Sequence, residues 1–159
     1  MRKKPEISLR TRALQYLARR EYSRAELRGK LLPYAQADED SGQAHPVGLD
    51  VLLDDLTACG WLSDARAATQ LLHTKRLRFG MQRITHELRQ KGIAEELISA
   101  ALPALKESEL EAARVVWQRK FGTLPQDARE KARQIRFLQS RGFGVDVIFQ
   151  VLRSEPDVE

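Results

Sequence analysis

Basic side chains offer the clearest chemistry in this chain, and they gather in three groups along its 159 residues. The groups lie near residues 19–24, 75–83 and 119–136. Guanidinium and ammonium groups bind phosphate oxygens without reading base sequence, and such binding weakens steeply with salt. The pattern therefore favours an anionic polymer as partner. The candidate binding residues are Arg19, Arg20, Arg24, Lys75, Arg76, Arg78, Arg83, Arg119, Lys120, Arg133 and Arg136.

The charge alternates in blocks along the chain. Residues 1–36 carry a net charge of +7, residues 37–66 carry −6, and residues 113–153 carry +6, within a total of +5. If the charged residues only kept the outer helix faces in water, each segment would mix both signs. The blocks instead favour separate basic patches over that simpler interpretation.

Catalytic and metal-binding patterns are missing from the sequence. The three histidines, His45, His73 and His86, are not spaced as helical metal ligands, and no HExxH, CxxC, GxxxxGK[ST] or GxSxG motif occurs. The Gly-Phe-Gly at residues 142–144 has no preceding strand and is interpreted as a turn. We therefore predict no enzyme activity, catalytic residue, cofactor or metal.

The remaining special residues are predicted to be structural. Cys59 is expected to be a small buried side chain, and a single cysteine excludes an internal disulfide. Trp61 and Tyr22 are candidates for stacking on bases, but both occupy turn positions that favour the core. No apolar run is long enough for a membrane span, and no secretory signal is recognised, so we predict a cytoplasmic protein.

We expect the basic residues to be positioned by helices. The sequence predicts about nine helices and no convincing strand. A helical hairpin recurs at residues 12–31, 83–102 and 133–152, with matching leucine, basic and turn-filling positions. Ser23 and Glu26 are spaced as a capping box, and Ser63 is expected to cap another helix. Pro103 is expected to end a helix. The second helices of the later hairpins are too apolar to read base edges.

The predicted helices group by threes, which gives an all-α chain of three tandem three-helix repeats. We predict a flexible N-terminus at 1–8, repeat 1 at 9–60 with an acidic loop at 35–46, repeat 2 at 61–104, repeat 3 at 105–153 and an acidic tail at 154–159. Because one triplet is small, each should need its neighbour to cover its apolar face, which favours an elongated, curved array. A monomer is expected.

Four stretches resemble the RecX family of regulatory proteins. They are residues 19–31 (RREYSRAELRGKL), 56–66 (LTACGWLSDAR), 78–93 (RFGMQRITHELRQKGI) and 137–143 (FLQSRGF). Together they cover nearly the whole chain, in the family's order. Ser63 and Ala67 depart from the family pattern, which often has an acid and an aromatic residue there.

The resemblance implies an all-helical array of three-helix repeats that binds RecA recombinase. Such proteins lie along the groove of the RecA–DNA filament and usually inhibit its ATPase, strand-exchange and coprotease activities, which affects recombination, DNA repair and the SOS response. The candidate basic residues then become candidate contacts to the filament or its DNA. The alternative is a free-standing, non-specific DNA-binding protein, and a small helical enzyme is the third hypothesis.

Overall fold

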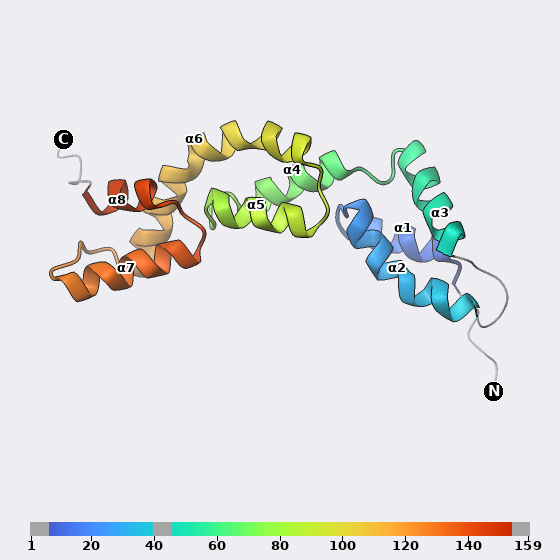
Figure 1. The fold of residues 1–159 in the computed structure, drawn as a ribbon, viewed down its shortest axis with the longest axis horizontal. Helices are drawn as coiled ribbons and strands as arrows, with labels where there is room; N and C mark the ends of the chain where they lie inside the picture. Colours follow the sequence, from blue (N-terminus) through green and yellow to red (C-terminus); the bar gives the residue numbers. More distant parts are fainter. Residues whose placement is uncertain (1–6, 40–45, 154–159) are drawn as a thin grey trace. The chain divides into compact units, whose positions relative to one another are not determined.

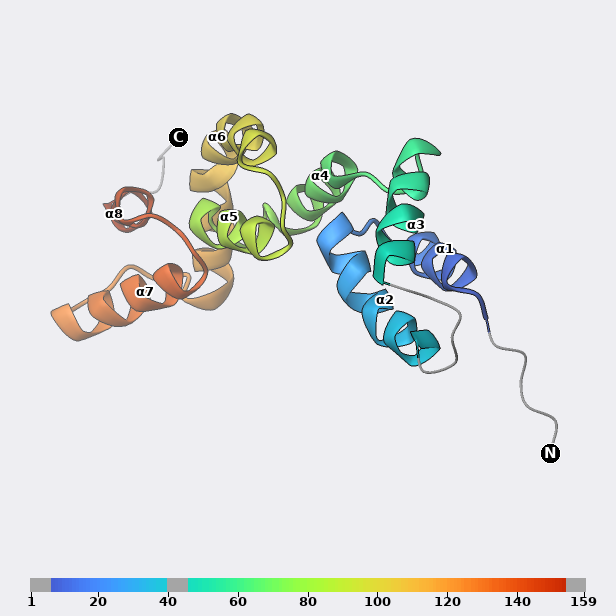
Figure 2. The ribbon, with the colours of Figure 1, turned by 45° about the vertical axis from the view of Figure 1, so that its right-hand side comes forward.

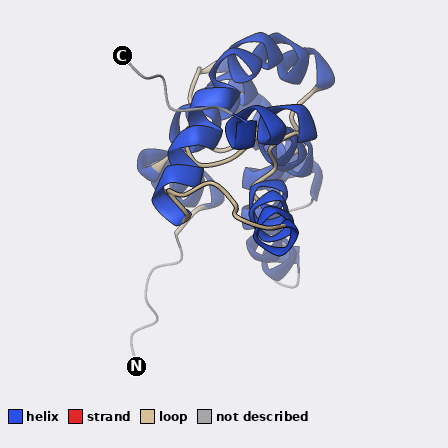
Figure 3. Cartoon of the chain, turned by 90° about the vertical axis from the view of Figure 1, so that its left-hand side faces the viewer, coloured by secondary structure: helices blue, strands red, loops and turns tan. Residues whose placement is uncertain are grey.

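The structure, a computed structural model, describes residues 7–39 and 46–153. Within these ranges the chain forms eight helices and no strand, which confirms the all-α prediction (Figures 1 and 3). The helices are α1 (Leu9–Arg19), α2 (Arg24–Glu39), α3 (Pro46–Ala58), α4 (Asp64–Lys75), α5 (Met81–Gln90), α6 (Glu95–Lys120), α7 (Ala128–Ser140) and α8 (Val145–Arg153).

The chain folds as two compact units. Unit 1 comprises residues 1–68 with 91–93, and unit 2 comprises residues 69–90 with 94–159. In unit 1, α1, α2 and α3 lie side by side (Figures 1 and 2) and enclose leucines such as Leu27, Leu31 and Leu53. In unit 2, the end of α6 packs with α7 and α8 around Leu138, Phe143 and other apolar side chains.

Side-chain caps begin several helices where the sequence places them. The Ser23 hydroxyl accepts a hydrogen bond from the Glu26 amide at 3.1 Å, and the Glu26 carboxylate accepts one from the Ser23 amide at 3.1 Å. This reciprocal pair confirms the predicted capping box. Ser63 likewise accepts from the Arg66 amide at 3.2 Å and caps α4 as predicted.

Helix α6 continues through Pro103, contrary to the prediction that this proline ends a helix. Proline removes one backbone hydrogen bond and typically costs about 3 kcal/mol inside a helix. Ile98 and Leu105 are buried on either side of it, so burial holds the helix on both sides. Two predicted helices are therefore one, which curves in Figure 1. This difference accounts for eight helices against about nine.

The predicted acidic loop at 35–46 is shorter than expected. Residues 35–39 belong to α2, and residue 46 begins α3. Ala35 is buried in the core of unit 1, which anchors the extra turn. The remaining part of the predicted loop, 40–45, lies outside the described residues, as do the predicted tail at 154–159 and most of the predicted N-terminus.

One stripe of leucines on α3 faces the core of unit 1. Leu49, Leu53 and Leu56 are buried, whereas Val51 is 62% exposed. Leucines spaced by four and three residues share one helical stripe, and Val51 falls outside it.

The turn after α3 also differs from the expectation. Leu62 fills this turn, so Trp61 is 57% exposed and Cys59 is exposed, which makes both core predictions wrong. Tyr22 is buried, as predicted.

Candidate nucleic-acid interface

A close contact between two turns organises the basic residues of unit 2. The Gly80 backbone N–H donates a hydrogen bond to the Arg141 carbonyl at 2.8 Å, and the Gln82 backbone N–H donates to the Gly142 carbonyl at 3.2 Å. A β-carbon on Gly80 would lie 2.3 Å from the Gly142 carbonyl carbon, and one on Gly142 would lie 2.3 Å from the Arg83 β-carbon. Gly142 also has a φ of +87°, which favours glycine. The contact fixes residues 79–83 against residues 140–143.

Cations stack on phenylalanine rings around this contact. The Arg83 guanidinium lies 4.2 Å from the Phe79 ring centroid, and that of Arg141 lies 5.4 Å from the same centroid. Arg141 also lies 5.3 Å from the Phe137 centroid, so it bridges the two rings. Such cation–π contacts hold guanidinium planes in place with little loss of their capacity to donate hydrogen bonds.

Lys75, Lys120 and Phe121 extend the same group. The Lys75 ammonium lies 5.6 Å from the Phe79 centroid, and the Lys120 ammonium lies 5.5 Å from the Phe137 centroid. Phe121 meets Phe137 edge to face, with 5.4 Å between centroids and an interplanar angle of 89°. The phenylalanine–cation cluster, as we call it, comprises Phe79, Phe121, Phe137, Lys75, Arg83, Lys120 and Arg141.

The cluster carries uncompensated positive charge. Lys75 pairs with the Glu87 carboxylate at 2.6 Å. Among the described residues, Arg83, Lys120 and Arg141 have no carboxylate partner, although Arg83 donates to the Ser140 carbonyl at 3.2 Å. Three cations with donors to spare, held on rigid rings, are suited to phosphate oxygens.

The other candidates in unit 2 are exposed around the same helices. Arg76 and Arg78 follow the end of α4, Arg119 lies in the last turn of α6, and Arg136 lies on α7. Within the described ranges, these four side chains have no ion-pair partner. They add to the positive charge of unit 2, but no ion pair among the described residues holds their side chains in place.

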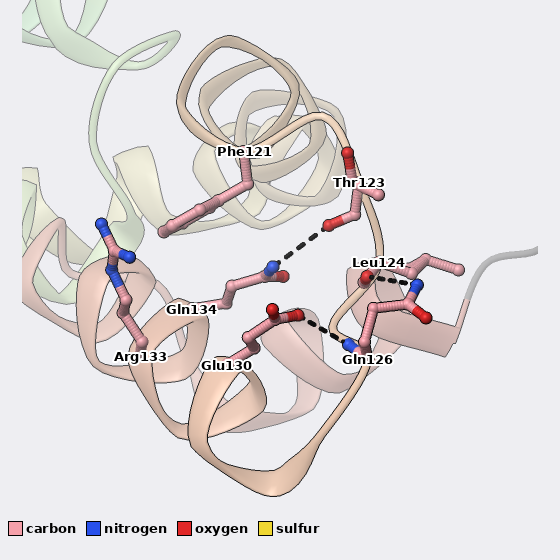
Figure 4. Close-up of a pocket in the computed structure, with 7 residues that line it drawn as sticks. All are labelled: Phe121, Thr123, Leu124, Gln126, Glu130, Arg133 and Gln134. Carbon is pink, nitrogen blue, oxygen red and sulfur yellow. Dashed lines mark hydrogen bonds between the residues drawn. The ribbon is translucent and has the colours of Figure 1, made fainter.

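Arg133 lines a pocket between the end of α6 and the start of α7 (Figure 4). The pocket has a volume of about 350 Å³. Its other lining residues are Phe121, Thr123, Leu124, Gln126, Glu130 and Gln134.

The first group of candidate bases has a different environment. Arg20 pairs with Glu26 at 2.9 Å and stacks over Tyr22, and Arg24 pairs with Asp54 at 2.7 Å. Arg19 is exposed and has no ion-pair partner among the residues described. The structure therefore places two of these three basic residues in intramolecular ion pairs, which compensate their charge.

The pKa of Glu26 records these contacts. Burial acts to raise the pKa of its carboxyl, but the hydrogen bonds from Arg20 and the Ser23 amide, with the charge of Lys91, lower it below the ordinary value. Lys91 lies 3.6 Å from the Glu26 carboxylate. One partly buried carboxylate thus compensates two basic side chains.

Arg141, Phe79 and Phe137 were not among the candidates selected from the sequence. One signal for Arg141 was present, because a base precedes the turn in all three hairpin copies, at Arg20, Lys91 and Arg141. Nothing in the spacing showed that the two phenylalanines would lie on either side of it. That arrangement depends on the contact between Gly80 and Gly142, which are 62 residues apart in the sequence.

The described residues form neither a metal cluster nor a membrane span. In residues 7–39 and 46–153, no three His, Cys, Asp or Glu side chains are grouped to hold a metal ion. In the same ranges, no helix combines the length and the apolar character needed to cross a bilayer.

Comparisons with known proteins agree on one family. Residues 63–102 match the family model of the second three-helix domain of RecX, and residues 107–152 match that of the third. The regulatory protein RecX of Leptothrix cholodnii is 50% identical over 150 residues, which is 94% of this chain and 90% of that protein. The protein of the same name from Chromobacterium violaceum is 44% identical, with 94% and 92% of the two chains covered.

Solved structures show the same fold. A crystal structure of RecX from Lactobacillus salivarius superposes with a TM-score of 0.70 at 18% identity, covering 91% of this chain and 92% of that one. A second crystal structure, of a regulatory protein RecX, gives a TM-score of 0.71 at 22% identity, covering 92% and 72%.

Proposed function

The chain belongs to the RecX family of regulatory proteins, and from this we propose that it binds the RecA recombinase and its DNA filament. There it inhibits the recombinase, ATPase and coprotease activities, and so modulates recombination, DNA repair and the SOS response. It acts in the cytoplasm as a monomer. Identity of 50% across nearly the whole chain to a RecX regulatory protein carries the proposal.

The phenylalanine–cation cluster supports an anionic surface as part of the partner. Arg83, Lys120 and Arg141 are held on aromatic rings, and the described residues supply them with no carboxylate. Phosphate oxygens of filament DNA match this charge and would be bound without base-sequence readout.

A repeated chain suits a repeated partner. A filament presents the same surface at regular intervals, so a ligand made of similar modules gains from the high effective concentration of the second contact once the first is made. Two three-helix domains in this chain match family models, which supports such modularity.

The DNA-stimulated ATPase of RecA tests the proposal. We expect the rate of ATP hydrolysis on single-stranded DNA to fall as the protein is added, and to reach a plateau near stoichiometric amounts. The same titration with a heat-denatured sample is the control. An unchanged rate of ATP hydrolysis with the protein in stoichiometric excess over RecA would contradict the proposal.

The alternative is a free-standing, non-specific DNA-binding protein, and the uncompensated cations of the cluster favour it. This alternative predicts tight binding to naked DNA with a steep salt dependence and no requirement for the recombinase. Weak binding to naked DNA, together with strong binding to the filament at the same salt concentration, would exclude the alternative.

A further inference from the structure

The pocket beside α7 has a rigid wall. The Gln134 amide is buried, accepts from the Trp117 indole at 2.8 Å and donates to the Thr123 carbonyl at 3.1 Å. Both ends of the amide are therefore used, and Gln134 fixes the loop after α6 in place (Figure 4). The Glu130 carboxylate accepts from the Gln126 backbone N–H at 2.7 Å and fixes the opposite side. The pocket is thus largely preformed.

Two apolar side chains line the pocket. Phe121 and Leu124 supply the apolar part of the lining. Phe121 is already held edge to face against Phe137, so its ring keeps one orientation. A pocket of about 350 Å³ is at the small end of the range of ligand sites and suits a single planar heterocycle.

The charge around the pocket is separated. Arg133 is exposed at the pocket, and among the described residues it has no carboxylate partner. Figure 4 shows its guanidinium on the same side of the pocket as the Phe121 ring, away from Gln126. The Glu130 carboxylate also lines the pocket and disfavours a phosphate group next to it. A ligand with a neutral planar part and an adjoining anion fits this arrangement.

The pocket is continuous with the phenylalanine–cation cluster. Phe121 belongs to both, and its neighbour Phe137 carries Lys120 and Arg141 at 5.5 Å and 5.3 Å from the ring centroid. A nucleic-acid strand whose phosphates lie on these cations therefore passes the pocket.

We propose that the pocket binds one unstacked nucleobase of a single strand, with the base against Phe121 and a neighbouring phosphate on Arg133. The inference rests on the proposed function to the extent that the strand belongs to the recombinase filament. Bases stack on aromatic side chains with little sequence preference, because every base has a π-face. A duplex keeps its bases paired and stacked, so it offers none to the pocket.

Oligonucleotides that lack bases separate this contact from phosphate binding. Full-length protein is titrated against labelled single strands of about twelve deoxycytidines and against abasic strands of equal length, at low salt, by fluorescence anisotropy. Because stacking is typically worth a factor of roughly 5 to 150 in affinity per base, we expect the abasic strand to bind weaker by a factor in that range. Phe121→Leu should bring the ratio of the two affinities close to one. Any loss of phosphate binding should affect both strands equally, because Phe121 packs against the Phe137 ring that holds Lys120 and Arg141.

Phe149→Leu is the matched control. Phe149 also carries cations, Lys131 at 5.7 Å and Arg153 at 5.5 Å from its ring centroid, but it does not line the pocket. This variant should retain the wild-type preference for strands with bases. Circular dichroism of each variant verifies folding, and wild-type protein alone supplies the base-versus-abasic comparison if Phe121→Leu does not fold.

Three results with the oligonucleotides would overturn the inference. They are equal affinity of wild-type protein for the two strands, no binding to either, and a base preference that survives in Phe121→Leu. Loss of affinity of Phe121→Leu for DNA-free recombinase, with oligonucleotide binding unchanged, would also overturn it by assigning the pocket to a protein side chain. In each case, wild-type inhibition of the recombinase ATPase shows that the proposed function itself survives.

Discussion

The two units each contain a close contact between turns, but the basic residue at that contact has a different environment in each unit. In unit 1 the Ser23 hydroxyl donates to the Lys91 carbonyl at 2.5 Å, and a β-carbon on Gly92 would lie 2.7 Å from that of Ala25. In unit 2 the Gly80 amide donates to the Arg141 carbonyl at 2.8 Å. In both units the accepting carbonyl is that of a basic residue, Lys91 or Arg141, which directly precedes a glycine of positive φ.

The difference lies in the compensating charge. Lys91 meets Glu26, whereas Arg141 lies over Phe79 and Phe137. Six ion pairs lie within unit 1, whereas Lys75–Glu87 and Arg89–Glu95 lie within unit 2. A basic side chain that pairs with a carboxylate of the same protein adds little to the positive electrostatic potential at the surface. A basic side chain that lies over an aromatic ring keeps its charge available to an anionic partner. We therefore propose that similar hairpins contribute to stability in unit 1 and to binding in unit 2.

The largest effect should come from removing the unit 2 contact. Gly142→Ala places a β-carbon 2.3 Å from that of Arg83 at a φ of +87°. Strain and overpacking of this kind together cost about 2–5 kcal/mol of the free energy of unfolding. The thermal midpoint measured by circular dichroism should fall clearly, and inhibition of RecA should fall with it.

The matched control is Gly29→Ala in α2, where an added β-carbon has no heavy atom within 4 Å. Because Gly29 lies inside a helix, alanine should raise stability by about 0.5–1 kcal/mol. If Gly142→Ala is as stable as wild type, the contact does not organise the cluster, and the comparison of the two units loses its basis.

Charge reversal should distinguish the roles of bases within unit 2. Arg83→Glu with Arg141→Glu should weaken binding to the RecA–DNA filament by at least about tenfold and lower the salt slope by roughly one for each phosphate that is no longer bound. Lys131→Glu with Arg153→Glu is the control, because these two cations also lie over a ring, that of Phe149. Anisotropy titrations at several salt concentrations measure both effects. Equal reductions in affinity in the two double variants would show that only net charge matters.

The sequence predicted the helices and their caps because those depend on residues close in the chain. The Ser23–Glu26 capping box and the buried Tyr22 were both predicted from spacing. Trp61 was misplaced because its turn needs only one apolar residue, and Leu62 fills it. Spacing along the chain cannot show which of two neighbours faces inward.

The basic groups were visible in the sequence, but their roles were not. Arg20 and Arg24 look like Arg83 in the sequence, yet they pair with Glu26 and Asp54, whereas Arg83 lies over Phe79. The Arg24 pair joins residues thirty apart, so its partner is set by the packing of α2 against α3. Whether a basic residue forms an intramolecular ion pair thus depends on long-range packing, which one sequence does not reveal.

The smallest expected effect concerns the pH dependence of unit 1. Because the pKa of Glu26 is lowered in the folded protein, its ion pairs and cap stabilise the fold fully above the ordinary pKa of 4.5. As the pH falls below that value, the unfolded chain binds a proton first, so this contribution declines and is lost once the pH passes below the folded pKa. Partly exposed pairs of this kind are typically worth about 1 kcal/mol or less.

Glu26→Gln tests this sign, because glutamine keeps the shape and the hydrogen-bond acceptor but not the charge. Wild type should be more stable than the variant near neutral pH, and the gap in thermal midpoint should close on acidification. Arg83→Gln, which alters a base of unit 2 without a carboxylate partner among the described residues, should show no such closing gap. If the difference in thermal midpoint between wild type and Glu26→Gln stays constant down to pH values well below 4.5, the charge of Glu26 does not stabilise unit 1. The contrast between ion-paired and ring-held basic residues would then rest on binding alone.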